Sequence, residues 1–289
     1  MTYSVVARDP RTGELGVACQ SHFFGVGAAV VWAEAGVGTV ATQALVEPAY
    51  GWRGLASMRD GTGAKEALDA ARDADPGAAA RQVAMLDARG GLAVHTGAEC
   101  LPVAGSRIGD GYSVQGNMLV AERVLDAMAA AMEDDGVLAD RLVGALQAAE
   151  RTGGEVRGAQ AAAIRIVAGE RPEQPWGGTL LDLRVDDALD PVGELTRLVR
   201  QQRLATTVVG ILFGDGRLFG DGDAVDDAAA RLAEVAADDS EVGLEARLWH
   251  SVLLSRSAAP EAAAARTELL ARRPTLEALL VHLDGSSAR

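Results

Sequence analysis

Two β-rich runs with a turn cluster between them open the chain, and they limit the folds that its first third can adopt. Residues 2–8 (TYSVVAR) and 15–21 (LGVACQS) carry β-branched and small apolar side chains, whereas residues 9–14 (DPRTGE) are typical of a turn. We therefore predict an antiparallel hairpin. If Arg8 pairs with Leu15, the register places Thr2 approximately opposite Ser21.

Further strands and helices are expected as far as residue 185. Apolar runs at 25–32 and 37–45 predict a second hairpin, and runs at 83–87 and 92–96 predict a third. Helical spacing or caps favour helices at 50–59, 64–72, from Pro76 through Arg81, at 122–133 and at 138–151. Residues 161–167 and 179–185 are typical of buried strands. This order favours an α+β fold in which an antiparallel-sheet sandwich is covered by helices.

From Pro191 the pattern becomes mainly helical. A Gly/Asp-rich break at 215–216 and 220–223 is followed by expected helices at 224–237, 242–255, 260–271 and 275–283. Alanine recurs at the contact positions of these helices, which suggests antiparallel hairpins of a repeat-like kind. We therefore divide the chain into a first domain of residues 1–204 and a helical C-terminal extension of residues 205–289.

Charge and cysteine content exclude several classes of function. Lys+Arg 27 against Asp+Glu 41 leaves a net charge of −14, which argues against nucleic acid or an anionic membrane as a partner. Lys65 is the only lysine, so Schiff-base and P-loop chemistry have little to work with. We find no signal-peptide pattern and only two cysteines, and so we expect a cytoplasmic protein without a disulfide framework.

Thr2 is the first candidate for chemistry. Removal of an initiator methionine before a small residue would leave Thr2 at the chain end, where one residue carries a hydroxyl nucleophile and an α-amine with a pKa of about 7.7–8.0 as its base. Such a mechanism needs neither histidine nor lysine. The alternative is that Thr2 is simply the first residue of a strand.

Several separated motifs resemble one family. They are residues 2–10 (TYSVVARDP), 36–44 (GVGTVATQA), 48–51 (PAYG), 81–82 (RQ), 95–97 (HTG), 111–119 (GYSVQGNML) and 157–160 (RGAQ). Together they resemble the family called domain of unknown function 1028, over roughly residues 1–200. The resemblance implies a four-layer αββα sandwich similar to that of the N-terminal-nucleophile (Ntn) hydrolases.

The same resemblance implies that Thr2 attacks an amide carbonyl while its α-amine accepts the proton. For the developing oxyanion we select Asn117, in the pair Gly116-Asn117, whose side-chain amide or adjacent backbone N–H can donate. Asn117 could instead cap a following helix, with Gly116 serving a turn. The polar residues near strand ends that we expect to contact substrate are Ser21, His22, Gln43 and Arg81.

The expected function is therefore amidohydrolysis of a small molecule without a cofactor. The protein could also form homo-oligomers. Arg81 and Arg157 could hold a substrate carboxylate or could merely pair with surface acids. The alternative from another class is a non-catalytic binding or scaffold protein whose helical extension recruits a partner.

A zinc site is a third option. Cys19, His22, His95 and Cys100 could supply four ligands if their hairpins abut. However, strand alternation directs Cys19 and His22 to opposite faces, so we expect no metal site.

Overall fold

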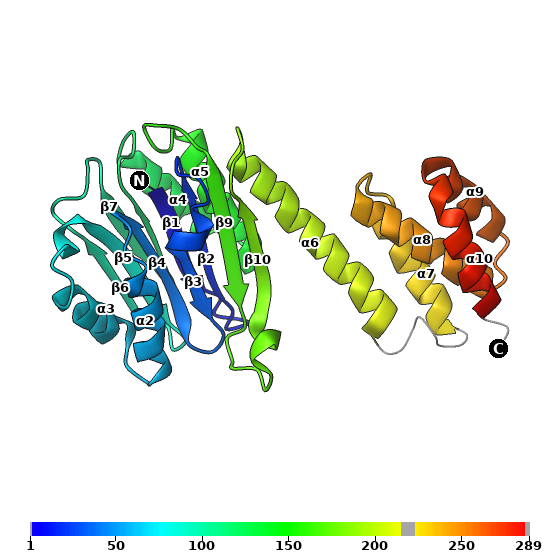
Figure 1. Ribbon diagram of the computed structural model, residues 1–289, viewed down its shortest axis with the longest axis horizontal. Helices are drawn as coiled ribbons and strands as arrows, with labels where there is room; N and C mark the ends of the chain where they lie inside the picture. The colour runs from blue at the N-terminus through cyan, green and yellow to red at the C-terminus, as the bar shows by residue number, and fades with distance from the viewer. Residues whose placement is uncertain (1, 215–222, 287–289) are drawn as a thin grey trace. The chain divides into compact units, whose positions relative to one another are not determined.

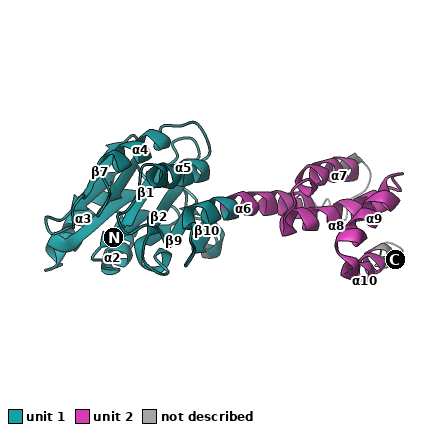
Figure 2. Cartoon of the chain, turned by 90° about the horizontal axis from the view of Figure 1, so that it is seen from above, with its two compact units in different colours: residues 1–198 teal, residues 199–289 magenta. Residues whose placement is uncertain are grey.

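The computed structural model describes residues 2–214 and 223–286 (Figure 1). The chain divides into two compact units, residues 1–198 and residues 199–289 (Figure 2). The division falls inside helix α6 (Pro191–Phe213), the helix that also contains the expected boundary near residue 205.

Two antiparallel sheets form the centre of the first unit. The six-stranded sheet has the order β10-β9-β2-β1-β8-β7, and the four-stranded sheet has the order β3-β4-β5-β6. The strands of the larger sheet are β1 (Thr2–Arg8), β2 (Leu15–Ser21), β7 (Gly105–Gly109), β8 (Tyr112–Gly116), β9 (Ala161–Val167) and β10 (Thr179–Val185). Those of the smaller sheet are β3 (Val31–Glu34), β4 (Gly38–Ala44), β5 (Arg81–Asp87) and β6 (Leu92–Thr96).

The sheets face one another, and each has a pair of helices on its outer face (Figure 1). Helices α2 (Ala49–Arg59) and α3 (Ala64–Asp73) cover the four-stranded sheet. Helices α4 (Arg123–Met132) and α5 (Leu138–Arg151) cover the six-stranded sheet. The expected α+β class with antiparallel sheets is confirmed.

Helix α5 packs closely on β2 because Gly16 has no side chain. A Cβ atom at Gly16 would lie 2.5 Å from Cδ1 of Leu142, which is fully buried. The buried residues of α5, including Leu138, Leu142 and Leu146, recur every four positions and so form one stripe that faces the sheet. This packing fixes one face of β1 and β2 against helix and leaves the other face to the second sheet.

The predicted register of the first hairpin is confirmed. Thr2 pairs with Ser21, and Arg8 pairs with Leu15. The third hairpin is also found, with β5 and β6 joined at residues 88–91. The helices expected at 50–59, 64–72, 122–133 and 138–151 correspond to α2, α3, α4 and α5.

Three expectations for the first unit are wrong. The predicted second hairpin is found as β3 paired with β4, but residues 25–32 are not one strand, because the short helix α1 (Gly27–Val30) precedes β3, which begins at Val31. Arg81 does not end a helix, because a single 3₁₀ turn (η1, Ala78–Ala80) precedes it and Arg81 begins β5. Strand β10 is mostly exposed rather than buried, because it lies at the edge of its sheet. The sequence pattern also missed β7 and β8.

The second unit is helical. Beyond α6 it contains α7 (Asp223–Ala236), α8 (Glu241–Arg256), α9 (Ala262–Arg272), the 3₁₀ turn η4 (Pro274–Leu276) and α10 (Glu277–Ser286). These agree with the four helices expected after the Gly/Asp-rich break predicted at 215–216 and 220–223; Asp223 begins α7, and the rest of that prediction falls outside the described residues. Ser240 caps α8, since its hydroxyl accepts from the Gly243 N–H at 3.2 Å. Among the described residues, no helix is both long and apolar enough to cross a bilayer.

Candidate functional site

Thr2 is the first residue of β1, a central strand with β2 on one side and β8 on the other. Alternate residues of β1 point to opposite faces of the sheet. The Tyr3 hydroxyl donates to Glu150 of α5, and burial beside this carboxylate raises the pKa of Tyr3 well above its usual value. Val6, on the other face, packs in the core between the sheets. Thr2 therefore faces the four-stranded sheet.

The Thr2 hydroxyl lies against Ser21. It donates to Oγ of Ser21 at 3.1 Å, and both residues are buried. The backbone explains this closeness: Asn117 N–H donates to the Thr2 carbonyl at 3.1 Å, so the backbone polar groups of Thr2 face β8 rather than β2. Thr2 and Ser21 are then a non-hydrogen-bonded pair, the kind in which facing side chains come closest.

Two side-chain amides hold the Thr2 carbonyl. Nε2 of Gln43, from β4, donates to it at 3.2 Å, and Nδ2 of Asn117, just after β8, donates to it at 3.3 Å. We call Gln43 and Asn117 the amide pair. Both also donate to Oε1 of Gln82, from β5, at 2.8 and 2.9 Å respectively. The site is thus assembled from both sheets, and residues far apart in the sequence converge on Thr2.

These groups belong to a larger set of buried polar side chains between the sheets, which we call the polar cluster. Each member is at most 3% exposed. The members are Thr2, Ser4, Ser21, Gln43, Gln82, Ser113, Gln115 and Asn117. Elsewhere the space between the sheets holds apolar side chains such as Val17, Ala41 and Leu86. Burial of polar groups costs free energy unless every group is hydrogen-bonded. Stability alone therefore does not explain why the polar cluster lies between the sheets.

Backbone strain occurs directly beside the amide pair. Ala44, the residue after Gln43, has a φ of 69°, and Met118, the residue after Asn117, has a φ of 52°. Positive φ is uncommon for residues other than glycine and costs on the order of 1–3 kcal/mol. Such strain persists where the surrounding structure demands it, which is frequently at functional sites.

A buried ion pair fixes the loop after β2. Glu155 is 3% exposed, and its Oε2 accepts from the His22 backbone N–H at 3.1 Å. Arg157 binds the same carboxylate, with a distance of 2.8 Å from one guanidinium nitrogen to Oε2, and this hydrogen bond raises the pKa of Arg157. The side chain of His22 is exposed. Arg157, which was expected to hold a substrate carboxylate or to pair with surface acids, therefore binds a buried acid.

Arg81 is also paired. Its guanidinium donates to Asp75 at 2.9 Å and to the Leu45 carbonyl at 2.7 Å, and the Tyr50 hydroxyl donates to Asp75 at 3.1 Å. The hydrogen bond from Arg81 lowers the pKa of Asp75 to about 2. A cavity of about 290 Å³ lies beside this group, between α2 and α3, and is lined in part by Glu47, Tyr50 and Asp75. A substrate carboxylate would have to compete with Asp75 for Arg81.

The residues considered as zinc ligands have separate surroundings. Cys19 is buried in the core between the sheets, and burial raises the pKa of its thiol to about 12. The Cys100 thiol donates to the Arg81 carbonyl at 3.3 Å, and Nε2 of His95 lies 2.8 Å from the Ala78 carbonyl. Within residues 2–214 and 223–286, no group of His, Cys, Asp and Glu could hold a metal ion.

Of the residues predicted for the site, the structure brings together Thr2, Ser21, Gln43 and Asn117. Gly116 contributes a carbonyl that accepts from Gln82 at 2.9 Å. The residues His22 and Arg81 are held by the separate ion-pair groups described above. Sequence reasoning missed Gln82, although residues 81–82 were among the quoted motifs, and it missed Gln115 and Ser4.

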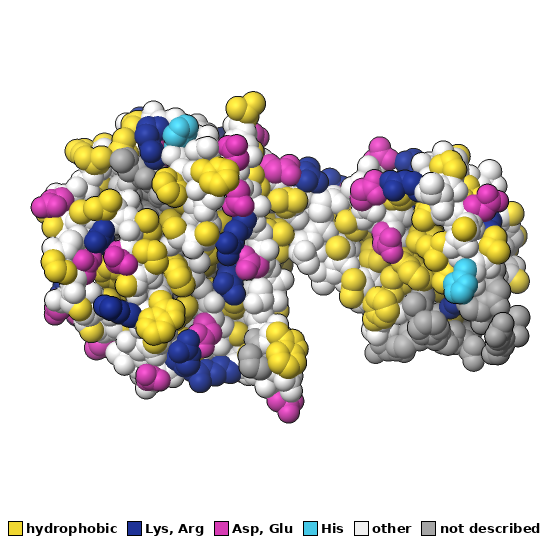
Figure 3. Space-filling view, viewed as in Figure 1, with side chains coloured by type: hydrophobic (Ala, Val, Ile, Leu, Met, Phe, Trp, Pro, Cys, Tyr) yellow, Lys and Arg dark blue, Asp and Glu magenta, His cyan; other side chains and the backbone are white. Residues whose placement is uncertain are grey.

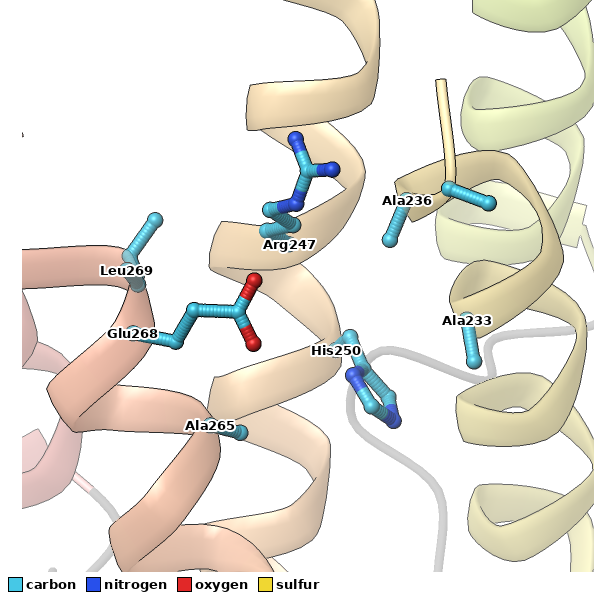
Figure 4. A pocket seen from close by; sticks show the side chains of 8 residues that line it. Ala233, Ala236, Arg247, His250, Ala265, Glu268 and Leu269 are labelled. Carbon is cyan, nitrogen blue, oxygen red and sulfur yellow. The ribbon is translucent and has the colours of Figure 1, made fainter. Parts of the chain in front are cut away.

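The second unit contains a separate cavity of about 280 Å³ between α7, α8 and α9 (Figure 4). Its polar side chains are Arg247 and His250 from α8 and Glu268 from α9, all of which extend into the space between the helices. Burial disfavours the charged imidazole and so lowers the pKa of His250. The remaining walls are apolar and consist of Ala233, Ala236, Ala237, Ala265 and Leu269.

The fold and the site define a class of protein: a two-sheet α+β domain in which a threonine at the start of a central strand is framed by buried amides. A family model described as a family of unknown function (DUF1028) matches residues 2–195, and the chain belongs to this family.

A solved structure of the same family is similar to this chain. The crystal structure of protein SPO2555 from Silicibacter pomeroyi, a DUF1028 protein, is 30% identical with a TM-score of 0.63. The likeness covers 78% of this chain and 93% of that one. No curated protein matches the chain.

Proposed function

We propose that the first unit is an amidohydrolase of the Ntn type with Thr2 as its nucleophile. The arrangement of layers supports this proposal, since two facing antiparallel sheets with helices on both outer faces correspond to the αββα sandwich of that class. The position of Thr2 at the start of a central strand supports it too.

The proposed reaction needs no group other than Thr2 to break the amide bond. Oγ1 of Thr2 attacks the carbonyl carbon, and its proton passes to the Thr2 α-amine. The tetrahedral intermediate then expels the amine product, which takes that proton, and leaves an ester on Thr2. Water attacks the ester, releases the acid and restores the hydroxyl. The proposal requires removal of Met1, which lies outside the described residues.

One observation carries the proposal: the hydroxyl and carbonyl of Thr2 are both held by a buried polar cluster. The bond from the Asn117 backbone N–H is an ordinary ladder bond, but the two side-chain amides on the same carbonyl exceed what the first residue of a strand needs. The cluster fixes Oγ1 against Ser21 and fixes the backbone through the amide pair, which is the pre-organisation that a nucleophile requires.

Asn117 is the proposed oxyanion donor, with Gly116 setting its position. Its backbone N–H and its side-chain amide now both donate to the Thr2 carbonyl. Because the side-chain amide also donates to Gln82, the backbone N–H is the group that has to turn toward the substrate during the reaction. We also propose that three residues contact the substrate. Ser21 lies beside the Thr2 hydroxyl, His22 directly follows β2, and Arg81 begins β5.

The test is covalent labelling of the purified chain. Intact mass first shows whether Met1 is absent. A β-lactone then serves as the acyl donor, because attack by Thr2 opens the ring and adds the whole mass of the lactone as an ester. Peptide mapping should place this adduct on Thr2 in the wild type and in Thr2→Ser. Thr2→Ala should remain unlabelled.

Thr12→Ala is the matched control, since Thr12 is an exposed threonine in the β1–β2 turn. This variant should be labelled as the wild type is. Labelling of Thr2→Ala at the wild-type level, or a mature chain that keeps Met1, would exclude Thr2 as the nucleophile.

A second candidate function is ligand binding by the helical unit, which the cavity between α7, α8 and α9 favours. Arg247, which donates to the Asp238 carbonyl at 3.2 Å, offers a cation, and Glu268, which lies 3.8 Å from Arg272, offers an anion. A small zwitterion such as a free amino acid is therefore a complementary ligand. Amino acids should raise the unfolding temperature of the wild type but not that of Arg247→Ala. Equal shifts in both would exclude this cavity as the site.

A further inference from the structure

The orientation of Gln82 is dictated by its neighbours. Its Nε2 lies 2.9 Å from the Gly116 carbonyl and 3.1 Å from the Gly105 carbonyl. Carbonyl oxygens can only accept, so the nitrogen of this amide has to face them and its oxygen has to face the other way. Gln82 is fully buried, and these contacts come from both strands of the β7–β8 hairpin. A flipped Gln82 amide is therefore excluded.

The orientation of the amide pair follows from that of Gln82. Oε1 of Gln82 can only accept, so both Gln43 and Asn117 present their nitrogens to it. Their second N–H groups are used as well, because both donate to the Thr2 carbonyl. The nitrogens of the pair are thus fully engaged, and their oxygens are turned away from Gln82.

Those two oxygens lack partners. Oε1 of Gln43 and Oδ1 of Asn117 are buried acceptors without a hydrogen bond in the described structure. Most buried polar atoms in proteins are hydrogen-bonded, so two unpaired acceptors on residues that bind one backbone carbonyl require an explanation. Oε1 of Gln20 and Oγ1 of Thr39 are also unpaired, but neither residue is bonded to Thr2 in the structure.

A donor with several protons close to Thr2 would satisfy both oxygens. In an antiparallel ladder the N–H and C=O of one residue point to the same neighbouring strand. The Thr2 carbonyl accepts from Asn117, so the Thr2 nitrogen also points toward Asn117. As an amide this nitrogen has one proton, whereas as a free ammonium it has three.

We propose that Gln82 is a positioning residue that turns the oxygens of the amide pair toward the α-ammonium of Thr2. The inference rests on the proposed function. In the proposed reaction the amine becomes an ammonium when it takes the hydroxyl proton, so acceptors fixed beside it stabilise the charge that develops there. Gln82 itself touches neither the nucleophile nor the substrate.

Charged groups nearby do not replace these acceptors. The carboxylate of Glu155 is paired with Arg157, and that of Asp75 is paired with Arg81. Glu150 lies on the opposite face of the sheet with Tyr3. The exposed His22 imidazole follows β2. The pKa of the Thr2 amine should therefore respond chiefly to the amide pair.

The experiment is an NMR titration of the processed protein with isotopically labelled threonine nitrogen, which reports the pKa of the Thr2 amine directly. Gln82→Met should lower this pKa by about 1, because the ammonium loses oriented acceptors. Asn117→Asp should raise it, because a carboxylate stabilises the ammonium more than an amide does. Asn117→Asp still tests whether the amide pair faces the Thr2 amine if Gln82→Met does not fold.

Gln20→Met is the matched control. Gln20 is equally buried and also has an unpaired oxygen, but its amide donates to Gly158. Gln20→Met should therefore leave the pKa of the Thr2 amine unchanged. A folded Gln82→Met with the wild-type amine pKa, an Asn117→Asp without a rise, or retention of Met1 would each overturn the inference. If either variant gives the contrary result, normal labelling of Thr2 by the lactone would show that the proposed nucleophile survives and only the role of Gln82 fails. Retention of Met1 would exclude both the nucleophile and the role of Gln82.

Discussion

Asp75 shows how a single side chain ties a loop to the strand end near the site. It accepts from Arg81 and Tyr50 and also caps the turn at Gly77, whose N–H donates to it at 2.8 Å. Its side chain is 15% exposed, and Arg81 lowers its pKa to about 2 from 3.8. The charged form is therefore favoured in the folded state more than in the unfolded one.

We predict that Asp75→Asn lowers the free energy of unfolding by roughly 2 kcal/mol at neutral pH. Because the folded-state pKa is depressed, this contribution is complete above about pH 4 and disappears as the pH falls through about 2. Denaturant unfolding at a series of pH values should show wild type and variant converging across that window. The exposed Asp73→Asn is the control, and a constant difference at all pH values would contradict the prediction.

Arg157 provides a second test at the residue scale. The carboxylate of Glu155 is fully buried, and removal of its cationic partner leaves a buried charge uncompensated. We expect Arg157→Met to cost about 3 kcal/mol in unfolding free energy. Lys65→Met, which breaks the exposed Lys65–Asp69 pair, should change the free energy of unfolding much less. Equal losses in the two variants would mean that the burial of Glu155 has no energetic consequence.

At the scale of elements, two helical glycines should respond oppositely to alanine. Gly144 lies in α5, and a Cβ atom there meets nothing within 4 Å, so Gly144→Ala should stabilise the first unit by about 0.5–1 kcal/mol. Gly51 lies in α2, where a Cβ would be 2.3 Å from the ring of Trp32 on β3. Gly51→Ala should destabilise by about 1–3 kcal/mol.

Unfolding midpoints in denaturant measure both effects on the same transition. Stabilisation by both substitutions would mean that Trp32 can move aside. Destabilisation by both would mean that α5 needs glycine at residue 144 for a reason other than space.

The elements that the sequence predicted share one property: their residues follow a single period. The register of β1 with β2 was predictable because the turn at residues 9–14 fixes it, and α5 was predictable because its apolar residues recur at helical spacing. Strand β8 was missed because polar residues point inward from it. Tyr112 and Val114 alternate with Ser113 and Gln115, and all four are buried.

Part of the site could not be predicted, because its residues meet across the two sheets. Ser21 and Gln43 were selected as polar residues near strand ends. Thr2 was selected as the residue left by removal of Met1, and Asn117 was selected through the family resemblance. These four do meet. Gln82 was not selected, because nothing in a linear pattern shows that β5 lies opposite β8 across the two sheets. The contacts that matter here are between sheets, and sequence periodicity carries information only within an element.

At the scale of the whole molecule, the two units differ in how they are built. The first has apolar cores around its sheets, such as the one containing Val6 and Leu86. The second has its own, formed by α6, α7 and α8 around residues such as Leu232, and by α8, α9 and α10. The face shown in Figure 3 has acidic and basic side chains interspersed on both units.

Because each unit has a complete apolar core, we predict that heating produces two unfolding transitions in calorimetry. Leu232 is fully buried in α7, and Leu232→Ala should lower only the transition of the second unit, by about 10 °C or more. Leu86→Ala, in β5 of the first unit, is the matched control and should lower only the other transition. Helix α6 crosses the division between the units, so it is the element through which they could be coupled. A single transition that both substitutions lower equally would show that α6 transmits stability between the units and that they do not fold independently.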